Sequence, residues 1–295
     1  MDKVGDPEKD IQTWTQEGVP LGMEREISVS SAFPAAEYPM HEIESIPAYE
    51  ALEAGIDNYT SLLAEKEEAR IELQRLIGLA FAEVIEEAEV LTTYGDGTIS
   101  RMAIIINLRA DQTKKRRIIV DLRRSGANSR ARVPERPVLP RILDAARMLI
   151  FHLRILTAWG ASVGLAGAQL LVYVDLLAAD FADAYFLFAV HPDELKHMLS
   201  RHVEPGQWLL WTNMCFGLRG APLLWSRCAG ALARLLSGVL RSGEGGLQLY
   251  LGDTLLILLG SEQRRHFLRG MLFYLVRALG IAISWGKTQV GLSLE

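Results

Sequence analysis

Cysteine is scarce in this chain of 295 residues, which contains only Cys215 and Cys228. Two cysteines cannot form the disulfide framework of a small secreted domain, and no cysteine or histidine cluster has the spacing of a zinc site. Proline (11) and glycine (25) are too few for a collagen. The hydrophobic fraction of 49% and the charged fraction of 23% exclude a disordered chain and a coiled coil. The composition therefore indicates a globular protein whose chemistry rests on other residue types.

The sequence also lacks a signal-peptide pattern, because residues 1–10 are polar and acidic where a basic and then apolar start is needed. We therefore expect an intracellular location, in the cytoplasm or the nucleus. One uncharged stretch, residues 155–174, is long enough to cross a bilayer as a helix. Its several glycines and the low mean hydropathy of the chain, +0.14, argue against a membrane partner. We interpret the stretch as a helix end, a glycine turn and a core strand at residues 170–174.

Basic residues are scarce in the first part of the chain, and acidic residues are the minority in the rest. Residues 1–100 contain 22 acidic and 6 basic side chains, whereas residues 101–295 contain 14 acidic and 25 basic ones. A basic body behind an acidic segment favours contact with a polyanion such as nucleic acid over ordinary solvated surface charge.

Hydrophobic periodicity predicts strands and helices that alternate in irregular order. Residues 1–58 carry several prolines and indicate an irregular arm. Helical patterns run from about Thr60 to before Gly95, over residues 222–240, and from Ser261 to Gly280. Strand patterns occupy residues 102–108 and 116–122, both halves of residues 247–259, and residues 281–285. This mixture favours an α+β fold over a doubly wound parallel sheet.

Three short strings stand in order in the second half of the chain. Residues 180–186 read DFADAYF, residues 215–222 read CFGLRGAP and residues 250–253 read YLGD. In type, order and separation they resemble the catalytic strand, the nucleotide-pocket loop and the Tyr-x-Asp-Asp hairpin of reverse transcriptases. Residues 117–125, 138–141 and 280–287 resemble further segments of that family. The set is more specific than any one member.

The resemblance covers about residues 95–290 and implies a retroelement or retrotransposon RNA-directed DNA polymerase. The implied fold is the right-hand polymerase fold, with an antiparallel palm sheet backed by helices and a fingers subdomain. We expect an acidic N-terminal arm and helix in residues 1–94, a fingers-like region in residues 95–160 and a palm-like region in residues 161–295. The thumb is expected to be absent. The implied partners are an RNA or DNA template-primer and dNTPs.

Asp180 and Asp253 are the candidate catalytic and metal-binding residues. Nucleotidyl transfer needs an activated hydroxyl and neutralised phosphate charge, which two Mg²⁺ or Mn²⁺ ions about 3.5 to 4 Å apart can supply. Hard cations need carboxylate oxygens. Without the resemblance, two such aspartates would be read as surface carboxylates. By resemblance, Lys287 is a third catalytic residue that protonates the leaving pyrophosphate.

The resemblance also implies a set of nucleotide-binding residues. Lys114, Lys115 and Arg117 are candidates for the triphosphate, although a solvated basic loop fits the same letters. The remaining candidates are Asp183, Tyr185, Phe216 and Gly217. Tyr185 would monitor the sugar 2′-position, and the Phe-Gly pair would shape the pocket, because glycine permits close backbone approach. Basic residues at 227, 234 and 241 recur every seven residues and indicate an exposed helix face or a nucleic-acid track.

The hairpin departs from the family pattern at Gly252, which replaces the first aspartate of the pair. Losing that carboxylate removes ligand oxygens and negative charge together, so the affinity for Mg²⁺ or Mn²⁺ is expected to fall. Folding should survive, since glycine is favourable in a tight turn. The sequence therefore predicts a polymerase domain that keeps its fold and has lost most catalysis. The alternative is a non-catalytic nucleic-acid-binding module derived from a retroelement, whose binding would be salt-sensitive and metal-independent.

Overall fold

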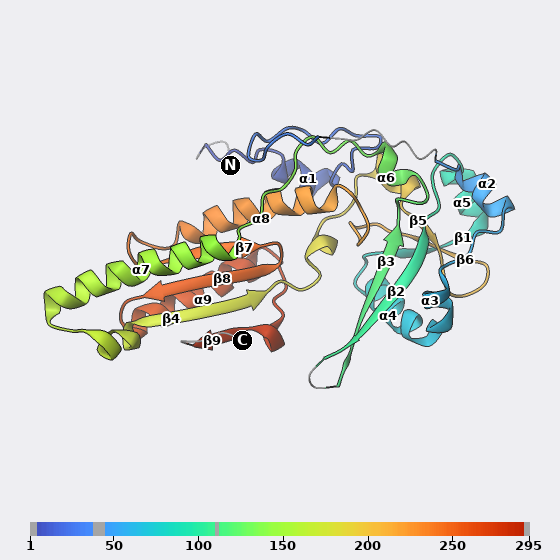
Figure 1. Ribbon diagram of the computed structural model, residues 1–295. Helices are drawn as coiled ribbons and strands as arrows, with labels where there is room; N and C mark the ends of the chain where they lie inside the picture. The colour runs from blue at the N-terminus through green and yellow to red at the C-terminus, as the bar shows by residue number, and fades with distance from the viewer. Residues whose placement is uncertain (1–4, 38–44, 110–111, 292–295) are drawn as a thin grey trace. The chain divides into compact units, whose positions relative to one another are not determined.

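The protein is a mixed α/β structure with antiparallel sheets, as the irregular order of its elements predicted. The computed structural model describes residues 5–37, 45–109 and 112–291. The chain forms two compact units (Figure 1). The first contains Met1–Arg136 and Tyr185–Leu224, and the second contains Pro137–Ala184 and Trp225–Glu295. The division of the chain at residues 94 and 160 stays a prediction.

The first unit contains short helices and two small sheets. Its helices are α1 (Ile11–Glu17), α2 (Ala48–Glu53), α3 (Thr60–Ala64), α4 (Lys66–Gly78), α5 (Glu87–Tyr94), α6 (Ala127–Arg130) and the 3-10 helices η3 (Ala184–Leu187) and η4 (Pro192–His197). Its strands are β1 (Glu83–Glu86), β2 (Arg101–Leu108), β3 (Lys114–Asp121), β5 (Leu199–Arg201) and β6 (Gln207–Leu210). The sheets have the orders β1-β6-β5 and β2-β3. The β2-β3 ladder confirms the predicted first hairpin, although residues 110 and 111 of its turn lie outside the described residues.

The single helix predicted between Thr60 and Gly95 is wrong. The chain breaks it at Glu65 and again at Ala80, where φ is 58°, and then forms the strand β1 and the helix α5. Ile85 of β1 pairs with Trp208 of β6, and both are buried in one apolar cluster. A strand that arrives more than a hundred residues later thus supplies hydrogen bonds that outweigh the local helical pattern.

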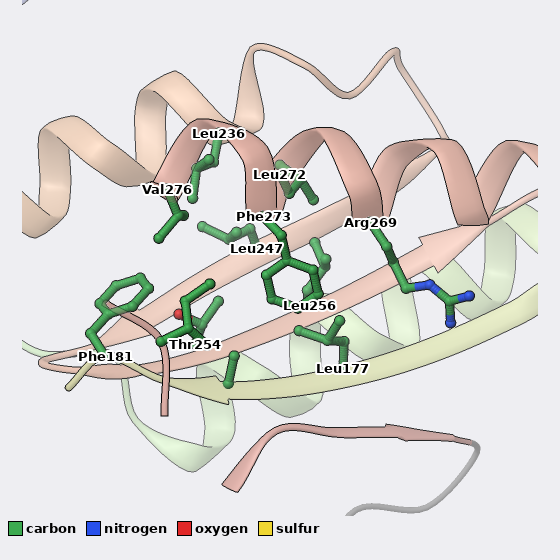
Figure 2. A pocket seen from close by; sticks show the side chains of 12 residues that line it. Leu177, Phe181, Leu236, Leu247, Thr254, Leu256, Arg269, Leu272, Phe273 and Val276 are labelled. Atoms are coloured by element: carbon green, nitrogen blue, oxygen red, sulfur yellow. The ribbon is translucent and has the colours of Figure 1, made fainter. Parts of the chain in front are cut away.

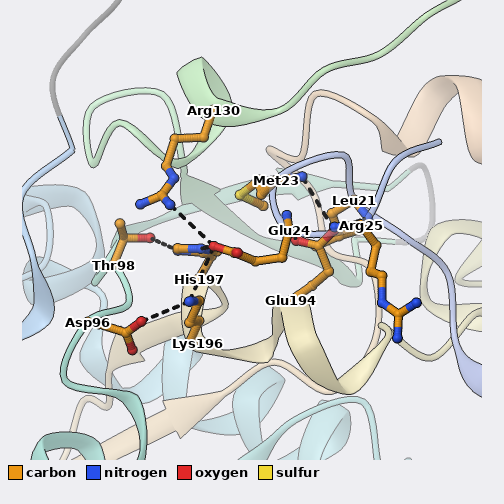
Figure 3. Close-up of polar contacts among 10 residues, drawn as sticks. All are labelled: Leu21, Met23, Glu24, Arg25, Asp96, Thr98, Arg130, Glu194, Lys196 and His197. Carbon is orange, nitrogen blue, oxygen red and sulfur yellow. Dashed lines mark hydrogen bonds and ion pairs between the residues drawn. The ribbon is translucent and has the colours of Figure 1, made fainter.

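The acidic N-terminal segment is irregular, as expected, and buried carboxylates attach it to the rest of the first unit, as Figure 3 shows for Glu194. Glu194 of η4 is fully buried and accepts four backbone N–H bonds from the loop between residues 21 and 25. Glu135 is 1% exposed and accepts from the backbone and hydroxyl of Ser30. Buried carboxylates are stable only when hydrogen bonds compensate for their lost hydration. These bonds therefore hold the segment in place.

Glu24, within the same loop, points toward three nitrogen donors, which come from a histidine, an arginine and a lysine. Its Oε1 lies 2.9 Å from Nε2 of His197, 3.2 Å from Arg130 and 3.3 Å from Lys196 (Figure 3). The hydrogen bond with His197, assisted by Lys196, lowers the pKa of the Glu24 carboxyl. Burial lowers the pKa of His197. Two carboxylates thus join the segment to η4: Glu194 extends from η4 to the loop, and Glu24 extends from the loop to His197 of η4.

The second unit is built around one antiparallel sheet with the strand order β7-β8-β4-β9 (Figure 1). Its strands are β4 (Val174–Asp180), β7 (Gly245–Tyr250), β8 (Asp253–Leu259) and β9 (Gln289–Gly291). Its helices are α7 (Ile142–Val163), α8 (Ala221–Ser237), α9 (Glu262–Ala278) and the 3-10 helices η2 (Gly167–Tyr173) and η5 (Trp285–Lys287). The predicted hairpin over residues 247–259 and the two helices that flank it are confirmed. Ser261 caps α9 by accepting from the backbone of Arg264.

Two predicted strands of this unit are wrong. Residues 170–174 mostly form η2, and the strand begins only at Val174. Leu170 packs against Gly160 of α7, so a compact turn buries it better than an extended segment. Residues 281–285 form only one bridge, between Ile283 and Phe181, and the edge strand β9 follows later.

Side-chain alternation along β4 and β8 gives the sheet two different faces. One face packs against α7 through an apolar cluster that includes Leu156, Val174 and Ile257. The other face meets α8 and α9 around a small apolar cavity lined in part by Leu272 and Thr254 (Figure 2). Residues of opposite parity in a strand point to opposite faces. Helices therefore pack against both faces of the sheet.

Among the described residues, no single helix has both the length and the hydropathy that crossing a membrane requires. The pair α7 and η2, which meet at a bend of 113°, meets these criteria only when the two are counted together.

Candidate active site

Asp180 and Asp253 come together at one end of the second unit's sheet. Asp180 is the last residue of β4, Asp253 is the first residue of β8, and the two are direct partners in the antiparallel ladder. Directly opposite residues of such a ladder project to the same face. The two carboxylates, which are 73 positions apart in the sequence, therefore stand side by side on one face, where Asp180 is partly buried and Asp253 is exposed.

The hairpin between β7 and β8 places Gly252 next to Asp180. A Cβ atom added at Gly252 would lie 3.4 Å from Oδ1 of Asp180, which is an ordinary contact. Positive φ falls on Leu251, at 53°, and not on Gly252. The turn therefore does not require glycine at this position, because its backbone is open to any L-residue. A side chain at 252 would point toward Asp180.

Lys287 also converges on Asp180. Its Nζ forms an ion pair with Oδ2 of Asp180. The carboxylate thus already has a cationic partner from η5. The role of Lys287 as a proton donor to pyrophosphate stays a prediction.

The donor set at this end of the sheet does not fit a pair of Mg²⁺ ions. Among the residues that the structure describes, no group of three or more histidine, cysteine, aspartate or glutamate side chains could hold a metal. Asp180 and Asp253 supply two carboxylates, Gly252 supplies none, and an ammonium group already occupies one oxygen of Asp180. Hard divalent ions need about six oxygen ligands each. The third acidic candidate, Asp183, lies in the same unit and has φ at 51°.

Tyr185 and Phe216 contact each other in the first unit. Their ring centroids are 5.5 Å apart in an edge-to-face arrangement, and burial raises the pKa of the Tyr185 phenol. Gly217 follows with φ at 116°, and a Cβ there would clash with the carbonyl oxygen of Val120 in β3. Close packing against β3 therefore requires glycine at position 217. Close approach to a ligand is not needed to explain it.

The basic residues of the β2-β3 hairpin divide between its two faces. Lys114 and Arg116 form ion pairs with Glu68 of α4. Both contacts lower the pKa of the Glu68 carboxyl, and the contact with Lys114 has the larger effect. Lys115 and Arg117 project to the opposite face, because side chains alternate along β3. Within the part of the chain that the structure describes, no ion pair engages Arg117. Of the triphosphate candidates, Lys114 is thus engaged with α4.

The two sets of candidates belong to different units. Asp180, Asp183, Asp253 and Lys287 lie in the second unit, whereas the basic hairpin and the 185, 216 and 217 positions lie in the first. Their combination into one nucleotide site stays a prediction.

The seven-residue spacing of basic residues on α8 does not mark a uniform surface. Arg227 is 1% exposed, whereas Arg234 is exposed. The interpretation of an exposed basic face along 227, 234 and 241 is therefore wrong at its first position. The helix lies against the apolar part of the unit there, since Trp225 and Cys228 are buried as well.

Several polar residues escaped the sequence analysis. The sequence did not single out Glu24, Glu68 or Glu194, yet each of these carboxylates contacts several donors. A weak signal for Glu194 is its place in the short string after Pro192, which opens η4. No local sequence pattern indicates the contacts of Glu24 and Glu68.

Comparisons with known proteins gave matches among solved structures alone. No model of a known protein family matches the sequence, and no curated protein matches it. The chain is similar to a foamy viral protease-reverse transcriptase in complex with double-stranded DNA, with 16% identity and a TM-score of 0.48 over 77% of this chain and 32% of that one. A second complex of that kind gives 15% identity and a TM-score of 0.49 over 79% and 38%.

The native protease-reverse transcriptase of prototype foamy virus gives 14% identity and a TM-score of 0.49, over 86% of this chain and 26% of that one. The chain thus spans between about a quarter and two fifths of the length of these structures.

Proposed function

We propose that this chain is a reverse transcriptase-like polymerase domain of retroelement type whose catalytic site is incomplete. The observation that carries the proposal is the pairing of Asp180 with Asp253 beside Gly252. A strand-end aspartate opposite a hairpin-tip aspartate is the arrangement that the sequence motifs imply for the palm. The second unit, with its sheet order β7-β8-β4-β9 and its helices α8 and α9, takes the part of the palm.

The first unit takes the part of the fingers. Its β2-β3 hairpin presents Lys115 and Arg117 on the face away from α4, where fixed cations favour phosphate oxygens. Tyr185 and Phe216 form an aromatic pair that suits the wall of a nucleotide pocket. The proposed partners are an RNA or DNA template-primer and dNTPs.

Catalysis is weak in this proposal because the site lacks a carboxylate at position 252. Divalent metal ions are the proposed cofactor of the parent activity, and their affinity falls when a bridging ligand is lost. Restoring the ligand is sterically simple, since the position of a Cβ at Gly252 is in ordinary contact with Asp180. The defect is therefore chemical and local.

Primer extension on a primed RNA template tests this proposal. The unmodified chain should extend the primer at or near background, and Gly252→Asp should raise extension about tenfold or more. Gly252→Asn is the matched control, because it adds the same volume without the charge. Robust extension by the unmodified chain, abolished by Asp180→Asn, would refute the incomplete site.

Nucleic-acid binding provides the second test. Affinity for a primer-template duplex should fall with salt, and Lys115→Ala and Arg117→Ala should each lower the logarithmic salt slope by about 0.7 to 0.9. Lys9→Ala, at an exposed lysine of the N-terminal segment, should leave the slope unchanged. Binding with no extension even by Gly252→Asp would instead identify a non-catalytic nucleic-acid-binding module.

A further inference from the structure

The segment after α9 forms backbone contacts with the end of β4 on both sides of Asp180. Ahead of Asp180 in the ladder, Ala178 pairs with Gln289 of β9. Beyond it, Phe181 bridges to Ile283, and the N–H of Ala182 donates to Ala282 at 2.9 Å. Residues 284–288 lie between these two points of attachment and leave the strand path as a short excursion.

Backbone hydrogen bonds fix this excursion in one shape. The N–H of Ser284 donates to the carbonyl of Asp180 itself at 2.8 Å. The N–H of Lys287 returns to the carbonyl of Ser284 at 2.9 Å, and Trp285 packs on Phe273 of α9 with ring centroids 5.0 Å apart. Lys287 is therefore delivered by a turn that is attached to the backbone of Asp180. The backbone of Lys287 is thus held close to Asp180, and its ammonium reaches the Asp180 carboxylate to form the ion pair.

Two adjacent carboxylates repel each other unless a cation stands beside them. Asp180 and Asp253 face the same side as ladder partners, and Asp180 is partly withdrawn from water, with 18% of its side chain exposed. Such a pair is stable when an opposite charge lies within about 4 to 6 Å. Lys287 supplies that charge from within the chain.

We propose that Lys287 is a built-in counter-ion that takes the place of a divalent cation at Asp180. The site then keeps its geometry without metal, and a divalent ion must displace the ammonium to reach Asp180. This inference rests on the proposed function, because it assumes that Asp180 and Asp253 descend from a metal site. It assigns to Lys287 a role that is distinct from proton donation.

Binding of Mn²⁺ to the full chain, measured from the electron paramagnetic resonance signal of free Mn²⁺, tests the inference. The unmodified chain should bind weakly. Lys287→Met removes the charge and should raise the affinity about tenfold, and Lys287→Gln, which keeps a hydrogen-bond donor, should do the same. Lys287→Arg keeps the charge and should leave binding weak. Addition of Asp180→Asn to Lys287→Met should abolish the gain.

Thermal unfolding under the same conditions supplies an independent readout. Mn²⁺ should raise the melting temperature of Lys287→Gln and not that of the unmodified chain, since a ligand stabilises the state that it binds. Unchanged Mn²⁺ affinity in both folded charge-removing variants, or an equal gain in Lys287→Arg, would overturn the inference.

The proposed function can fail separately. If Lys287→Gln gains metal while neither it nor Gly252→Asp extends a primer, the counter-ion role stands and the polymerase proposal falls. Extension by Gly252→Asp with unchanged metal binding in the Lys287 variants gives the reverse result.

Discussion

Glu194→Gln should destabilise the first unit by releasing the N-terminal segment. Oε1 of Glu194 accepts from the backbone N–H of Leu21 at 2.9 Å, of Arg25 at 3.0 Å and of Met23 at 3.3 Å. Oε2 accepts from the N–H of Glu24 at 3.1 Å. The carboxylate is fully buried, so no water replaces a bond that is lost.

The magnitude follows from what glutamine can keep. Its oxygen can occupy the position of Oε1 and retain three bonds, now without charge. Its NH₂ group then faces the N–H of Glu24, donor against donor. A hydrogen bond to a charged group contributes about 1.5 to 3 kcal/mol, and a buried unsatisfied donor costs about 1 to 3 kcal/mol. Because such terms are not additive, we expect a loss of roughly 2 to 4 kcal/mol in the free energy of unfolding.

Urea unfolding of the full chain, followed by tryptophan fluorescence and circular dichroism, measures this loss. Limited proteolysis should also cut residues 18–30 sooner in the variant. The matched control is Asp193→Asn at the neighbouring position, whose carboxylate pairs with Arg25 at 2.6 Å while about half of each side chain is exposed. An exposed pair contributes less than about 1 kcal/mol. Equal stability of Glu194→Gln and Asp193→Asn would refute the reasoning.

Three other predictions concern single residues. Burial lowers the pKa of His197 from its usual value of 6.5, and the hydrogen bond with His197 lowers the pKa of Glu24 from its usual value of 4.5. The unfolded state therefore gains protons first as the pH falls, and stability should fall below about pH 6.5 and again below about pH 4.5. A urea midpoint that increases as the pH is lowered from about 7 to about 5 would contradict this prediction. Gly217→Ala should cost more than about 2 kcal/mol in urea unfolding, since φ is 116° and its Cβ meets Val120; a loss under about 0.5 kcal/mol would show that β3 adapts. Thr254→Val should stabilise by about 1 kcal/mol, because the buried Thr254 hydroxyl has no partner among the described residues, and a lower melting temperature would reveal an unseen one (Figure 2).

Local patterns in the sequence were sufficient to predict helices, and hairpins whose strands are neighbours in the sequence. The hairpins β2-β3 and β7-β8 and the helices α8 and α9 lie where apolar periodicity and turn residues predicted them. The pairing of Asp180 with Asp253, which are distant in the sequence, was implied only by the resemblance of the motifs, and the ladder register shows it. Errors occurred where distant chain segments compete with local preference, as at β1 and at η2.

The sequence by itself determined which residue types could do chemistry: two aspartates, a glycine where a third carboxylate is expected, and a basic hairpin. Only the tertiary structure decided which charges meet. Lys287 and Asp180 are 107 positions apart, and Glu194 and the loop at residue 21 are 173 apart. A carboxylate has the same letter on the surface and in a closed pocket. Its environment is set by how the backbone of distant segments folds around it, because hydration and hydrogen bonding depend on neighbours in space.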